Sequence, residues 1–366
     1  MWQPNNSGYW ENGAMMDESL LSPQPFVLRS TPVRLGLIGC GRISHQHMRA
    51  LREIPAVIVA GLADVREENI AALTADFPEL KNAEAYHDYR EMLKTNLDGV
   101  IIMTPHGLHY QHIKESLEAG KHVLSEKPFV TQPDQARELI ALATARERIL
   151  MVSYQNPRLW PYRYTQQQIA AGNLGDILFY SGQITQQWGA FGGWRLSSTL
   201  SEGGMLVDTG SHFVDIMLYL TTMRPDTVAA FNDTDGEQVD IINGAVIRFN
   251  GGRVATLAAV GRGPTLWNIT IVGTKGTIEI WDRDNIRHIG ADNYVGWIGT
   301  PRTNLVPPEG ERPESTTPQA EFVAAVAKND LSASDAARGL AVAQLTQAIY
   351  ASAREGGTPV AITSGE

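Results

Sequence analysis

Cysteine is almost absent from this chain of 366 residues, because Cys40 is the only one. A single cysteine excludes an intrachain disulfide and a zinc site built from several cysteines. No apolar run approaches the roughly 20 residues that a transmembrane helix requires. Basic residues are outnumbered, with 30 lysines and arginines against 40 acidic residues and a formal net charge of −10. Nucleic acid and membranes are therefore not expected as partners.

The first 30 residues carry no recognisable targeting signal, because they lack a basic n-region, an apolar h-region and a twin arginine. We interpret residues 1–30 as an N-terminal tail or arm. It is either floppy or an ordered arm in which Trp2, Tyr9 and Trp10 dock on a neighbouring domain or subunit. With one cysteine and no such signal, the expected location is the cytoplasm.

Residues 31–151 alternate between short apolar runs and helical stretches. The segment VRLGLIGCGRISHQHMRALREI predicts a buried strand, a glycine-rich turn and a helix. The apolar runs in VIVAGLADV, LDGVIIMTP and HVLSEKP are likewise each followed by a helical stretch. This alternation predicts an α/β domain of the Rossmann type, a doubly wound parallel sheet with helices on both faces.

Residues 152–366 consist largely of short strands joined by glycine-rich turns, such as DILFYSGQITQQW, TVAAFNDTD and NITIVGTKGTIEIWD. The stretch FNGGRV predicts a tight hairpin. MLVDTGSHFVDIMLYL predicts a helix placed early in this region, and two further helices close the chain. We expect a C-terminal α+β domain with a large, mostly antiparallel open sheet.

The stretch GCGRIS places Gly39 and Gly41 between a strand and a helix. Gly39 allows a tight turn, and Gly41 lets the backbone at Arg42 and Ile43 approach a pyrophosphate at the positive end of the helix. Asp64 ends the second strand, where a carboxylate accepts hydrogen bonds from a ribose diol and repels a 2′-phosphate. The pattern predicts an NAD site, with NADP disfavoured; an ordinary turn with a helix-capping aspartate is the alternative.

The strand HVLS is followed by Glu126, Lys127 and Pro128. Open α/β sheets bind ligands at the carboxyl ends of their strands, so the Lys127 ammonium is expected in the crevice near the nicotinamide. Glu126 would neutralise or orient this lysine. Pro128 would fix the backbone that follows, with a cis Lys-Pro bond as one way of doing so. A solvated Glu–Lys pair on a loop is the alternative.

Asp208 and His212 lie four residues apart in GGMLVDTGSHFVDIM, which puts them on one face of the predicted helix. By itself, the pair would suit half a metal site, a structural hydrogen-bonded pair or an acid/base unit. No further histidine or carboxylate has a convincing ligand spacing. No metal is therefore predicted.

These stretches resemble the glucose-fructose oxidoreductase, inositol dehydrogenase and rhizopine catabolism family (Gfo/Idh/MocA). The resemblance is carried by GCGRIS, ADVREEN, HDYREML, TPHGLHYQH and AGKHVLSEKP, and it continues in NPRLWPYR, GGMLVDTGSHFVDI and LAVAQLTQAIYASAREGGTPVAI. It covers about residues 31 to 364. His106 stands where the family often has Asn, and Phe129 where a smaller aliphatic residue is usual. Both departures would reshape the pocket around nicotinamide or substrate.

The resemblance implies that Lys127, Asp208 and His212 converge on the substrate carbinol. His212 would serve as general base, cationic Lys127 would stabilise the alkoxide, and Asp208 would orient a substrate hydroxyl or the imidazole. In some relatives a lysine or a tyrosine takes over the proton transfer. The stretch TPHGLHYQH implies further cofactor contacts at Thr104, Pro105, His106 and His109, although His109 would also fit a helix surface.

Candidate substrate contacts are Tyr154, Arg158, Trp194 and Arg195. Aromatic faces beside hydrogen-bonding groups suit a sugar ring, whose C–H faces stack while its hydroxyls are held at the edge. Trp188 lies in the same tryptophan-rich loop as Trp194. These tryptophans could instead be core or subunit-interface residues.

We predict an NAD-dependent dehydrogenase that oxidises a secondary hydroxyl of a sugar, glycoside or cyclic polyol by hydride transfer to nicotinamide. Two alternatives use the same residues or fold: a redox-neutral NAD-dependent glycosidase, and a non-catalytic NAD-binding regulator or partner subunit. The family resemblance also implies a homodimer or homotetramer that forms through the C-terminal sheet.

Overall fold

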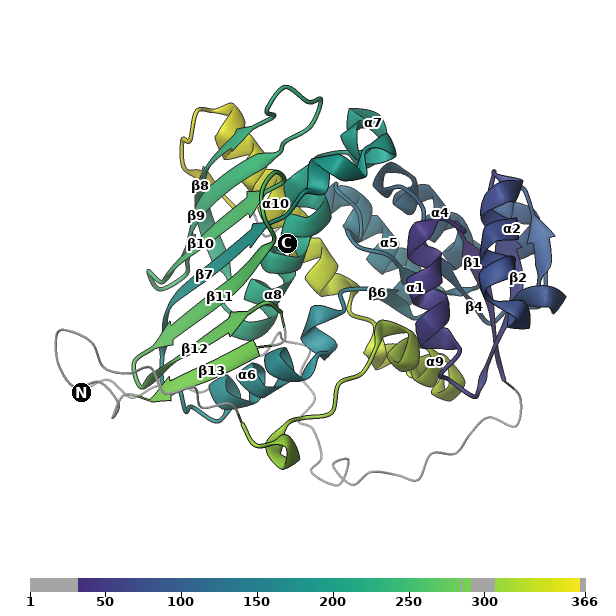
Figure 1. Ribbon diagram of the computed structural model, residues 1–366, viewed down its shortest axis with the longest axis horizontal. Helices are drawn as coiled ribbons and strands as arrows, with labels where there is room; N and C mark the ends of the chain where they lie inside the picture. The colour runs from purple at the N-terminus through teal and green to yellow at the C-terminus, as the bar shows by residue number, and fades with distance from the viewer. Residues whose placement is uncertain (1–31, 284, 291–306, 363–366) are drawn as a thin grey trace.

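The computed structural model describes residues 32–283, 285–290 and 307–362. Two sheets lie side by side, with helices around and between them (Figure 1). The predicted N-terminal tail lies outside the described residues. Within the described part of the chain, no helix combines the length and apolarity needed to cross a membrane.

The first sheet is parallel and has six strands in the order β3-β2-β1-β4-β5-β6. The strands are β1 (Val33–Ile38), β2 (Val57–Ala63), β3 (Glu84–Tyr86), β4 (Gly99–Ile102), β5 (His122–Ser125) and β6 (Leu150–Val152). Strands β4, β5 and β6 are fully buried, as expected of parallel strands covered on both faces. The predicted doubly wound sheet is confirmed. The sequence did not indicate β3, because its three residues form an exposed edge without an apolar pattern.

Helices cover both faces of this sheet: α1 (Arg42–Leu51), α2 (Glu67–Asp76), α3 (Tyr89–Leu93), α4 (His109–Glu118), α5 (Pro133–Ala145) and α9 (Pro318–Lys328). Helix α9 comes from the far end of the chain and packs against α1, β1, β5 and β6. Its Phe322, Val323 and Val326 join the apolar cluster of Leu35 and Leu37. The first domain is therefore completed by a C-terminal segment, which a linear boundary near residue 151 does not predict.

The second sheet has eight strands in the order β13-β12-β11-β7-β10-β9-β8-β14. They are β7 (Ile177–Thr185), β8 (Pro225–Asp233), β9 (Ile242–Phe249), β10 (Val254–Val260), β11 (Leu266–Gly273), β12 (Gly276–Trp281), β13 (Asn285–Gly290) and β14 (Val360–Ala361). Among the described strands of this sheet, only β7 and β10 pair in parallel, so the mostly antiparallel sheet is confirmed. The hairpin predicted at FNGGRV joins β9 to β10, with Gly251 and Gly252 at φ of 85° and 84°.

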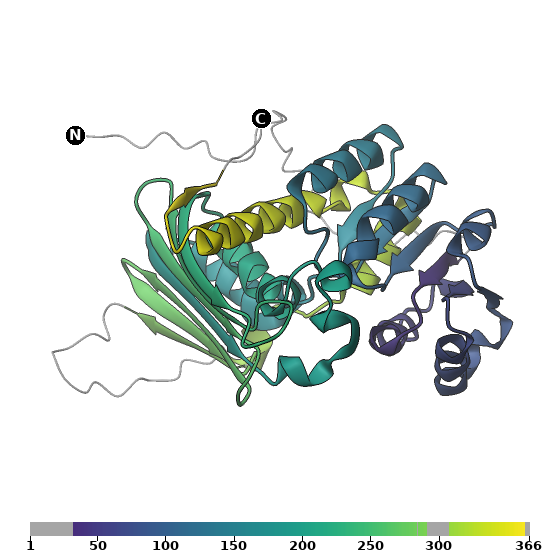
Figure 2. The ribbon, with the colours of Figure 1, turned by 90° about the horizontal axis from the view of Figure 1, so that it is seen from above.

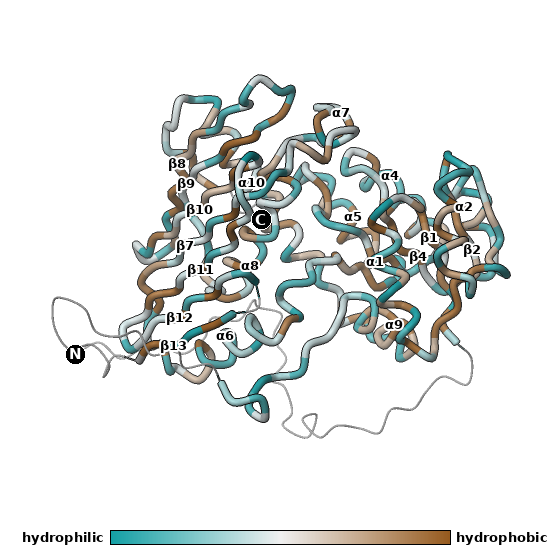
Figure 3. Tube along the Cα trace, in the orientation of Figure 1, coloured by the Kyte–Doolittle hydropathy of each residue, from teal (hydrophilic) through white to brown (hydrophobic). Residues whose placement is uncertain are grey.

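One face of this sheet is covered by α6 (Trp160–Ala170), α8 (Ser211–Thr221) and α10 (Ala336–Arg354), and no described element lies on the other face (Figure 2). Exposure along β9 alternates strictly, with every second side chain buried beneath the helices. Apolar residues run along the strands of both sheets (Figure 3).

The remaining elements are short helical segments. They are α7 (Ser198–Ser201), a π-helical turn (Leu206–Gly210) and the 3-10 turns Pro78–Asn82, His106–Leu108, Asn156–Arg158, Trp188–Phe191, Gly193–Leu196, Glu309–Glu311 and Leu331–Ala333. The His106–Leu108 turn packs against α7 and the Asn156–Arg158 turn packs against α8, so these turns lie where the two domains meet, which is the position of the candidate site.

Candidate active site

The glycine-rich turn after β1 leaves the start of α1 open. Gly39 has φ +91°, and a Cβ there would lie 2.8 Å from the carbonyl oxygen of Met103. Gly41 is the N-cap of α1 and offers no capping side chain, and a Cβ built on it meets open space. Ser44 is fully buried and donates to the Gly41 carbonyl at 2.6 Å. The free N–H groups of this helix start form the cradle that a pyrophosphate requires.

Asp64 stands at the end of β2, beside this turn. Its Oδ2 accepts from the backbone N–H of Cys40 at 2.8 Å and from Asn69 Nδ2 at 3.1 Å, and its Oδ1 accepts from the Arg66 N–H at 2.9 Å. Three donors thus hold the carboxylate where the ribose diol of NAD would lie. The residues of the turn and of β2 fit this cofactor.

Arg42 links the turn to the second domain. Its guanidinium lies over the ring of Phe191, 4.7 Å from the centroid. Phe191 belongs to the loop that also carries Trp194 and Arg195, and 48% of its surface is exposed. Ile43 packs against the apolar cluster under α1. The cofactor cradle and the loop with the predicted substrate residues are therefore in direct contact.

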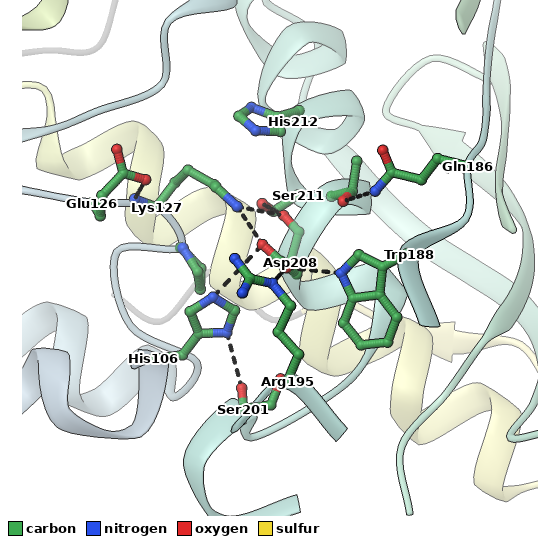
Figure 4. A network of polar contacts seen from close by, with 12 residues as sticks. His106, Glu126, Lys127, Gln186, Trp188, Arg195, Ser201, Asp208, Ser211 and His212 are labelled. Carbon is green, nitrogen blue, oxygen red and sulfur yellow. Dashed lines mark hydrogen bonds and ion pairs between the residues drawn. The ribbon is translucent and has the colours of Figure 1, made fainter. Parts of the chain in front are cut away.

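Lys127 pairs with Asp208, which lies at the centre of a polar network (Figure 4). The Lys127 ammonium donates to Asp208 Oδ1 and, at 3.2 Å, to the Asp208 backbone carbonyl. The Lys127–Pro128 peptide is cis, the arrangement named as an option from the sequence. Lysine and aspartate come from different domains, so the pair spans the interface between them.

Glu126, which was expected to neutralise or orient Lys127, contacts the backbone N–H of this lysine. Its Oε1 lies 2.8 Å from His47 Nε2, and its Oε2 accepts the backbone N–H of Lys127 at 3.1 Å. Gln319 Nε2 lies 2.8 Å from His47 Nδ1, which completes a chain from α9 through α1 to the lysine loop. Burial alone would raise the pKa of Glu126, but the bond from His47 and the charge of Lys127 prevail and bring it to about 2. Glu126 is thus a buried carboxylate that holds the backbone of this loop.

Two further donors saturate Asp208. Its Oδ2 accepts from Trp188 Nε1 and from Arg195 Nε, both at 2.8 Å. Burial opposes its charge, yet the charges of Lys127 and Arg195 hold the pKa of this carboxyl well below its usual range. Asp208 is therefore a fixed anion that cannot accept a proton near neutral pH. Trp188 is completely buried and serves as a donor to Asp208, so it offers no stacking face to a sugar.

Asp208 lies on a π-helical turn, and not on the regular helix that the sequence predicted. Just before this turn, Asp240 accepts the backbone N–H groups of Gly204 and Leu206 at 2.7 and 2.9 Å. It also accepts from the Tyr350 hydroxyl at 2.6 Å. Single-turn π-bulges are frequent at functional sites. Here Asp240 fixes the segment from which Asp208 projects.

His106 faces Asp208 from the first domain. Its Nδ1 lies 3.1 Å from the Ser201 carbonyl, to which it donates, and its Nε2 lies 3.7 Å from Asp208 Oδ1. Burial lowers the pKa of His106 to about 3, and the positive charge of Lys127 acts in the same direction. Trp194 meets the His106 ring edge-on at 4.6 Å, and the Arg195 guanidinium lies 4.5 Å from the Trp194 ring centroid. The predicted residues His106, Trp194 and Arg195 thus form one wall around Asp208.

His109 is not on a surface. It is fully buried, with Nδ1 at 2.8 Å from the Pro128 carbonyl and Nε2 at 2.9 Å from the Thr104 carbonyl. It therefore joins the two loops that carry the predicted cofactor residues and does not present a free nitrogen to a ligand. The Thr104 hydroxyl is paired with His112 Nδ1 at 2.9 Å, and Pro105 precedes the His106 turn.

His212 lies one turn beyond Asp208, and Figure 4 shows it on the side of Lys127. Its Nδ1 is 3.3 Å from Asn156 Nδ2. No hydrogen bond joins it to Asp208 within the described part of the chain, although a hydrogen-bonded pair was one of the alternatives that the sequence left open. Burial lowers the pKa of His212 to about 3, helped by the charges of Lys127 and Arg283. The imidazole is neutral near pH 7.

Tyr154 and Arg158 do not line the crevice as expected. Tyr154 is 1% exposed, and its ring backs His212 at 6.0 Å. The Arg158 guanidinium is bound by Glu321 at 2.6 Å, by Asp335 at 3.0 Å and by the Tyr154 carbonyl at 2.7 Å. A buried ion network therefore occupies Arg158 and ties α9 and α10 to the end of the first sheet.

Several residues of the site were not singled out from the sequence. They are His47, Asn156, Asp240, Arg283 and Gln319. Each lies far along the chain from the residue that it supports, so no local spacing indicates its role. Only Asn156 lay in a stretch that carried the family resemblance, NPRLWPYR. Among the described residues, no group of three histidine, cysteine or acidic side chains is placed to hold a metal ion.

Comparison with solved structures supports this fold. Levoglucosan dehydrogenase in complex with NADH and levoglucosan superposes with a TM-score of 0.79 at 24% identity, over 91% of this chain and 100% of that one. Among curated proteins, D-glucoside 3-dehydrogenase of Escherichia coli is 28% identical over 53% of this chain and 55% of its own length. D-xylose 1-dehydrogenase [NADP(+)] of Haloarcula marismortui is 24% identical over 68% of this chain and 72% of its own.

Family models match both domains. Residues 33–154 match the model described as "Oxidoreductase family, NAD-binding Rossmann fold", and residues 162–279 match the GFO/IDH/MocA C-terminal domain. Together the two matches span well over half of the chain. This chain belongs to the Gfo/Idh/MocA family of NAD-binding oxidoreductases.

Proposed function

We propose that this protein is an NAD-dependent dehydrogenase that oxidises a secondary hydroxyl of a sugar, glycoside or cyclic polyol. The observation that carries the proposal is the meeting of Lys127, Asp208 and His212 at the carboxyl ends of the parallel strands, beside a cradle that fits NAD. Bound NAD would supply the hydride acceptor. The protein would supply the groups that bind and polarise the alcohol oxygen.

Each of the three residues has a distinct part in this proposal. Asp208 stays ionised and holds the Lys127 ammonium in place. The ammonium stabilises negative charge on the substrate oxygen, as a preorganised cation does in a water-poor site. His212 is neutral and offers a ring nitrogen to the same oxygen. His106, Trp194 and Arg195 close the opposite side around Asp208.

A sugar or polyol is the substrate class best supported. Trp194 and Arg195 combine an aromatic ring with hydrogen-bond donors, which suits a ring carrying several hydroxyls. The names of the similar proteins, D-glucoside 3-dehydrogenase and D-xylose 1-dehydrogenase, point to the same class. A ring hydroxyl of a glycoside, for instance at C3, is the preferred case.

The open face of the second sheet supports a homodimer or homotetramer. Phe231 on β8, Ile242 and Val246 on β9 and Leu266 on β11 project from the face that no described element covers, and each is 39–66% exposed. Apolar side chains gathered on one sheet face favour association. A second copy of this chain is the proposed occupant.

The direct test follows NADH absorbance after the protein is mixed with NAD and a panel of monosaccharides, inositols, amino sugars and glycosides. A rise that depends on one class of compound supports the proposal and identifies the substrate. Release of an aglycone without net NADH would favour the redox-neutral glycosidase instead. NAD binding with neither signal would favour a regulatory role.

Replacement of Lys127 tests the assigned chemistry. Lys127→Ala should abolish turnover and leave NAD affinity near that of the wild type. Trp188 and Arg195 should still hold Asp208 in place in this variant. Lys114→Ala is a suitable control, since Lys114 forms a surface pair with Glu138 on the outside of the same domain. Steady-state kinetics and NAD titration provide the measurements. Comparable turnover in Lys127→Ala would refute the role of Lys127.

A further inference from the structure

A chain of two hydrogen bonds runs from Arg283 to His212. Arg283, in the turn between β12 and β13, donates through Nε to Asn156 Oδ1 at 3.1 Å. Asn156 Nδ2 in turn lies 3.3 Å from His212 Nδ1. Asn156 is 1% exposed and His212 is 7% exposed, so water does not compete for these contacts. His212 Nε2 makes no hydrogen bond within the described part of the chain and is not one of its sealed-off polar atoms.

Each partner in this chain has only one chemically allowed role. A guanidinium has five N–H donors and no acceptor, so the atom of Asn156 that faces Arg283 must be the amide oxygen. The amide nitrogen then faces His212 and donates. A nitrogen that accepts this bond cannot itself carry a proton. His212 Nδ1 is therefore the bare nitrogen of the neutral ring.

Arg283 is itself held in place. In the orientation that satisfies both of its neighbours, Gln155 accepts from Arg283 Nη2 at 3.1 Å and donates to the Ser153 carbonyl at 3.3 Å. The guanidinium also lies 5.9 Å from the ring centroid of Trp267. Among the described residues, no carboxylate pairs with Arg283. Within the described part of the chain, its donors are thus directed at the two amide side chains.

We propose that Arg283, acting through Asn156, is a positioning residue that keeps the proton of neutral His212 on Nε2. His212 then faces the substrate as a hydrogen-bond donor and not as a general base. This inference rests on the proposed dehydrogenase function for its catalytic meaning, but the position of the proton does not depend on the substrate. It replaces the sequence-based expectation that His212 removes the hydroxyl proton.

The proposal divides the work between the two groups at the substrate oxygen. During oxidation, the hydroxyl proton would pass to Lys127 Nζ, where Asp208 stabilises the resulting ammonium, and NAD, when bound, would supply the acceptor for the hydride. His212 keeps its own proton and donates a hydrogen bond to the oxygen throughout. In reduction, the Lys127 ammonium returns the proton. The other charged groups that act on His212 are Glu126, Asp208 and Arg283.

Nitrogen NMR on protein labelled with 15N-histidine tests the proposal directly. Protonated and bare ring nitrogens give well-separated shifts, and the His212 signals are assigned by their loss in His212→Gln. We expect a bare-type Nδ1 and a protonated-type Nε2 at neutral pH, with the other tautomer populated roughly tenfold less or lower, because it would forfeit a charge-assisted bond. A protonated Nδ1 in the wild-type protein would overturn the proposal.

Three variants separate the relay from general structural support. Arg283→Met removes the donor and should let the Asn156 amide turn, so that both tautomers appear and kcat falls about tenfold with little change in KM. Arg283→Lys keeps a donor-only group and should restore most of the wild-type spectrum. Asn156→Asp offers acceptors to both neighbours and should move the proton to Nδ1.

Arg287→Met is the matched control, because Arg287 lies on β13 and pairs with Glu279, away from Asn156. It should change neither the His212 signals nor kcat. Unchanged His212 signals in both Arg283→Met and Asn156→Asp would overturn the relay. The spectra need no substrate, so a silent sugar panel would count against the proposed function alone.

Discussion

At the scale of single residues, the site is defined by groups whose charge state is set by burial. His106 and His212 are both buried against the pair of Lys127 and Asp208, and the pKa of each is lowered to about 3. Asp208 is held ionised. One fixed anion and two neutral imidazoles therefore surround the lysine. A dehydrogenase needs such an arrangement so that its donors and acceptors are already oriented when charge develops on the substrate oxygen.

The buried histidines predict acid sensitivity of the fold. A histidine whose pKa falls from about 6.5 in the unfolded chain to about 3 in the folded one makes the unfolded state bind more protons between these values. The free energy of unfolding should therefore be highest above pH 6.5 and should decline as the pH falls towards 3. Each of the two histidines should lower the free energy of unfolding by about 2 kcal/mol between pH 6.5 and 5. Glu126 adds to the decline only below about pH 4.5, its value in the unfolded chain, because its folded pKa lies near 2.

Urea unfolding measured between pH 7 and pH 5 checks this expectation. His106→Asn should flatten the slope of the unfolding free energy by about one histidine's share, roughly 1.4 kcal/mol per pH unit. His87→Asn serves as control, because His87 lies on the surface beside Glu67. A slope that is the same in His106→Asn and in the wild type would show that His106 titrates normally in the folded protein.

Asp64 carries the prediction on cofactor choice. Asp64→Ala should raise the KM for NAD by roughly ten- to a hundredfold, because charge-assisted hydrogen bonds to the ribose diol are lost. It should at the same time relax the rejection of NADP, because the repulsion of a 2′-phosphate disappears. The ratio of kcat/KM for the two cofactors is the measurement. General loosening of the turn would weaken both cofactors alike, and an unchanged ratio would contradict the ribose assignment.

At the scale of elements, the π-helical turn places Asp208 and His212 relative to one another. The turn is possible because two glycines precede it: a Cβ on Gly204 would lie 2.0 Å from the Asp240 carbonyl oxygen, and one on Gly203 2.5 Å from Val207. Asp240 then accepts the N–H groups that the start of the turn leaves free. The two glycines therefore make room for the protein's own backbone.

Gly204→Ala should therefore damage both stability and catalysis. The close approach to Asp240 must open, which should destabilise the fold by at least about 2 kcal/mol. Because Asp208 moves with the turn, kcat should fall while NAD affinity stays near the wild-type value. Gly310→Ala is the control, since a Cβ there meets open space and φ is not positive. Thermal unfolding and steady-state kinetics are the measurements. The same stability and kcat in both variants would contradict the positioning role of the turn.

At the scale of the whole molecule, the site exists only where the two domains meet. Lys127 follows a strand of the first sheet, while Asp208 and His212 come from the helical layer on the second sheet. Helix α9 and the ion network of Arg158 with Glu321 and Asp335 fasten the domains to one another. The geometry of the polar network therefore depends on how the domains are docked.

The open face of the second sheet carries the prediction on assembly. Val246→Glu should shift the oligomer towards monomer by roughly a hundredfold or more in dissociation constant, because each interface would bury an unpaired charge. Leu331→Glu, an exposed apolar position away from the sheet, should leave assembly unchanged. Sedimentation velocity measures both. A wild-type protein that stays monomeric at high concentration would contradict the proposed interface.

Much of this architecture could be predicted from the chain alone. Local patterns predicted the alternation of strands and helices, the glycine-rich turn and the position of Asp64. Burial on two faces and turns that need particular φ values each produce a recognisable pattern within a few residues. The same is true of the FNGGRV hairpin and of Lys127 at a strand end. These features were predicted and are seen in the structure.

Only the tertiary structure decided which side chains meet. The sequence did not indicate that Asp208 binds the Lys127 ammonium directly or that His47 contacts Glu126. Arg158 was expected in the crevice but neutralises buried carboxylates. Contacts between residues far apart in the chain leave no periodic signal, because they depend on how the elements pack and not on local spacing. The sequence by itself determined the elements and the chemical groups at their ends, and the docking of the two domains determined the partner of each group.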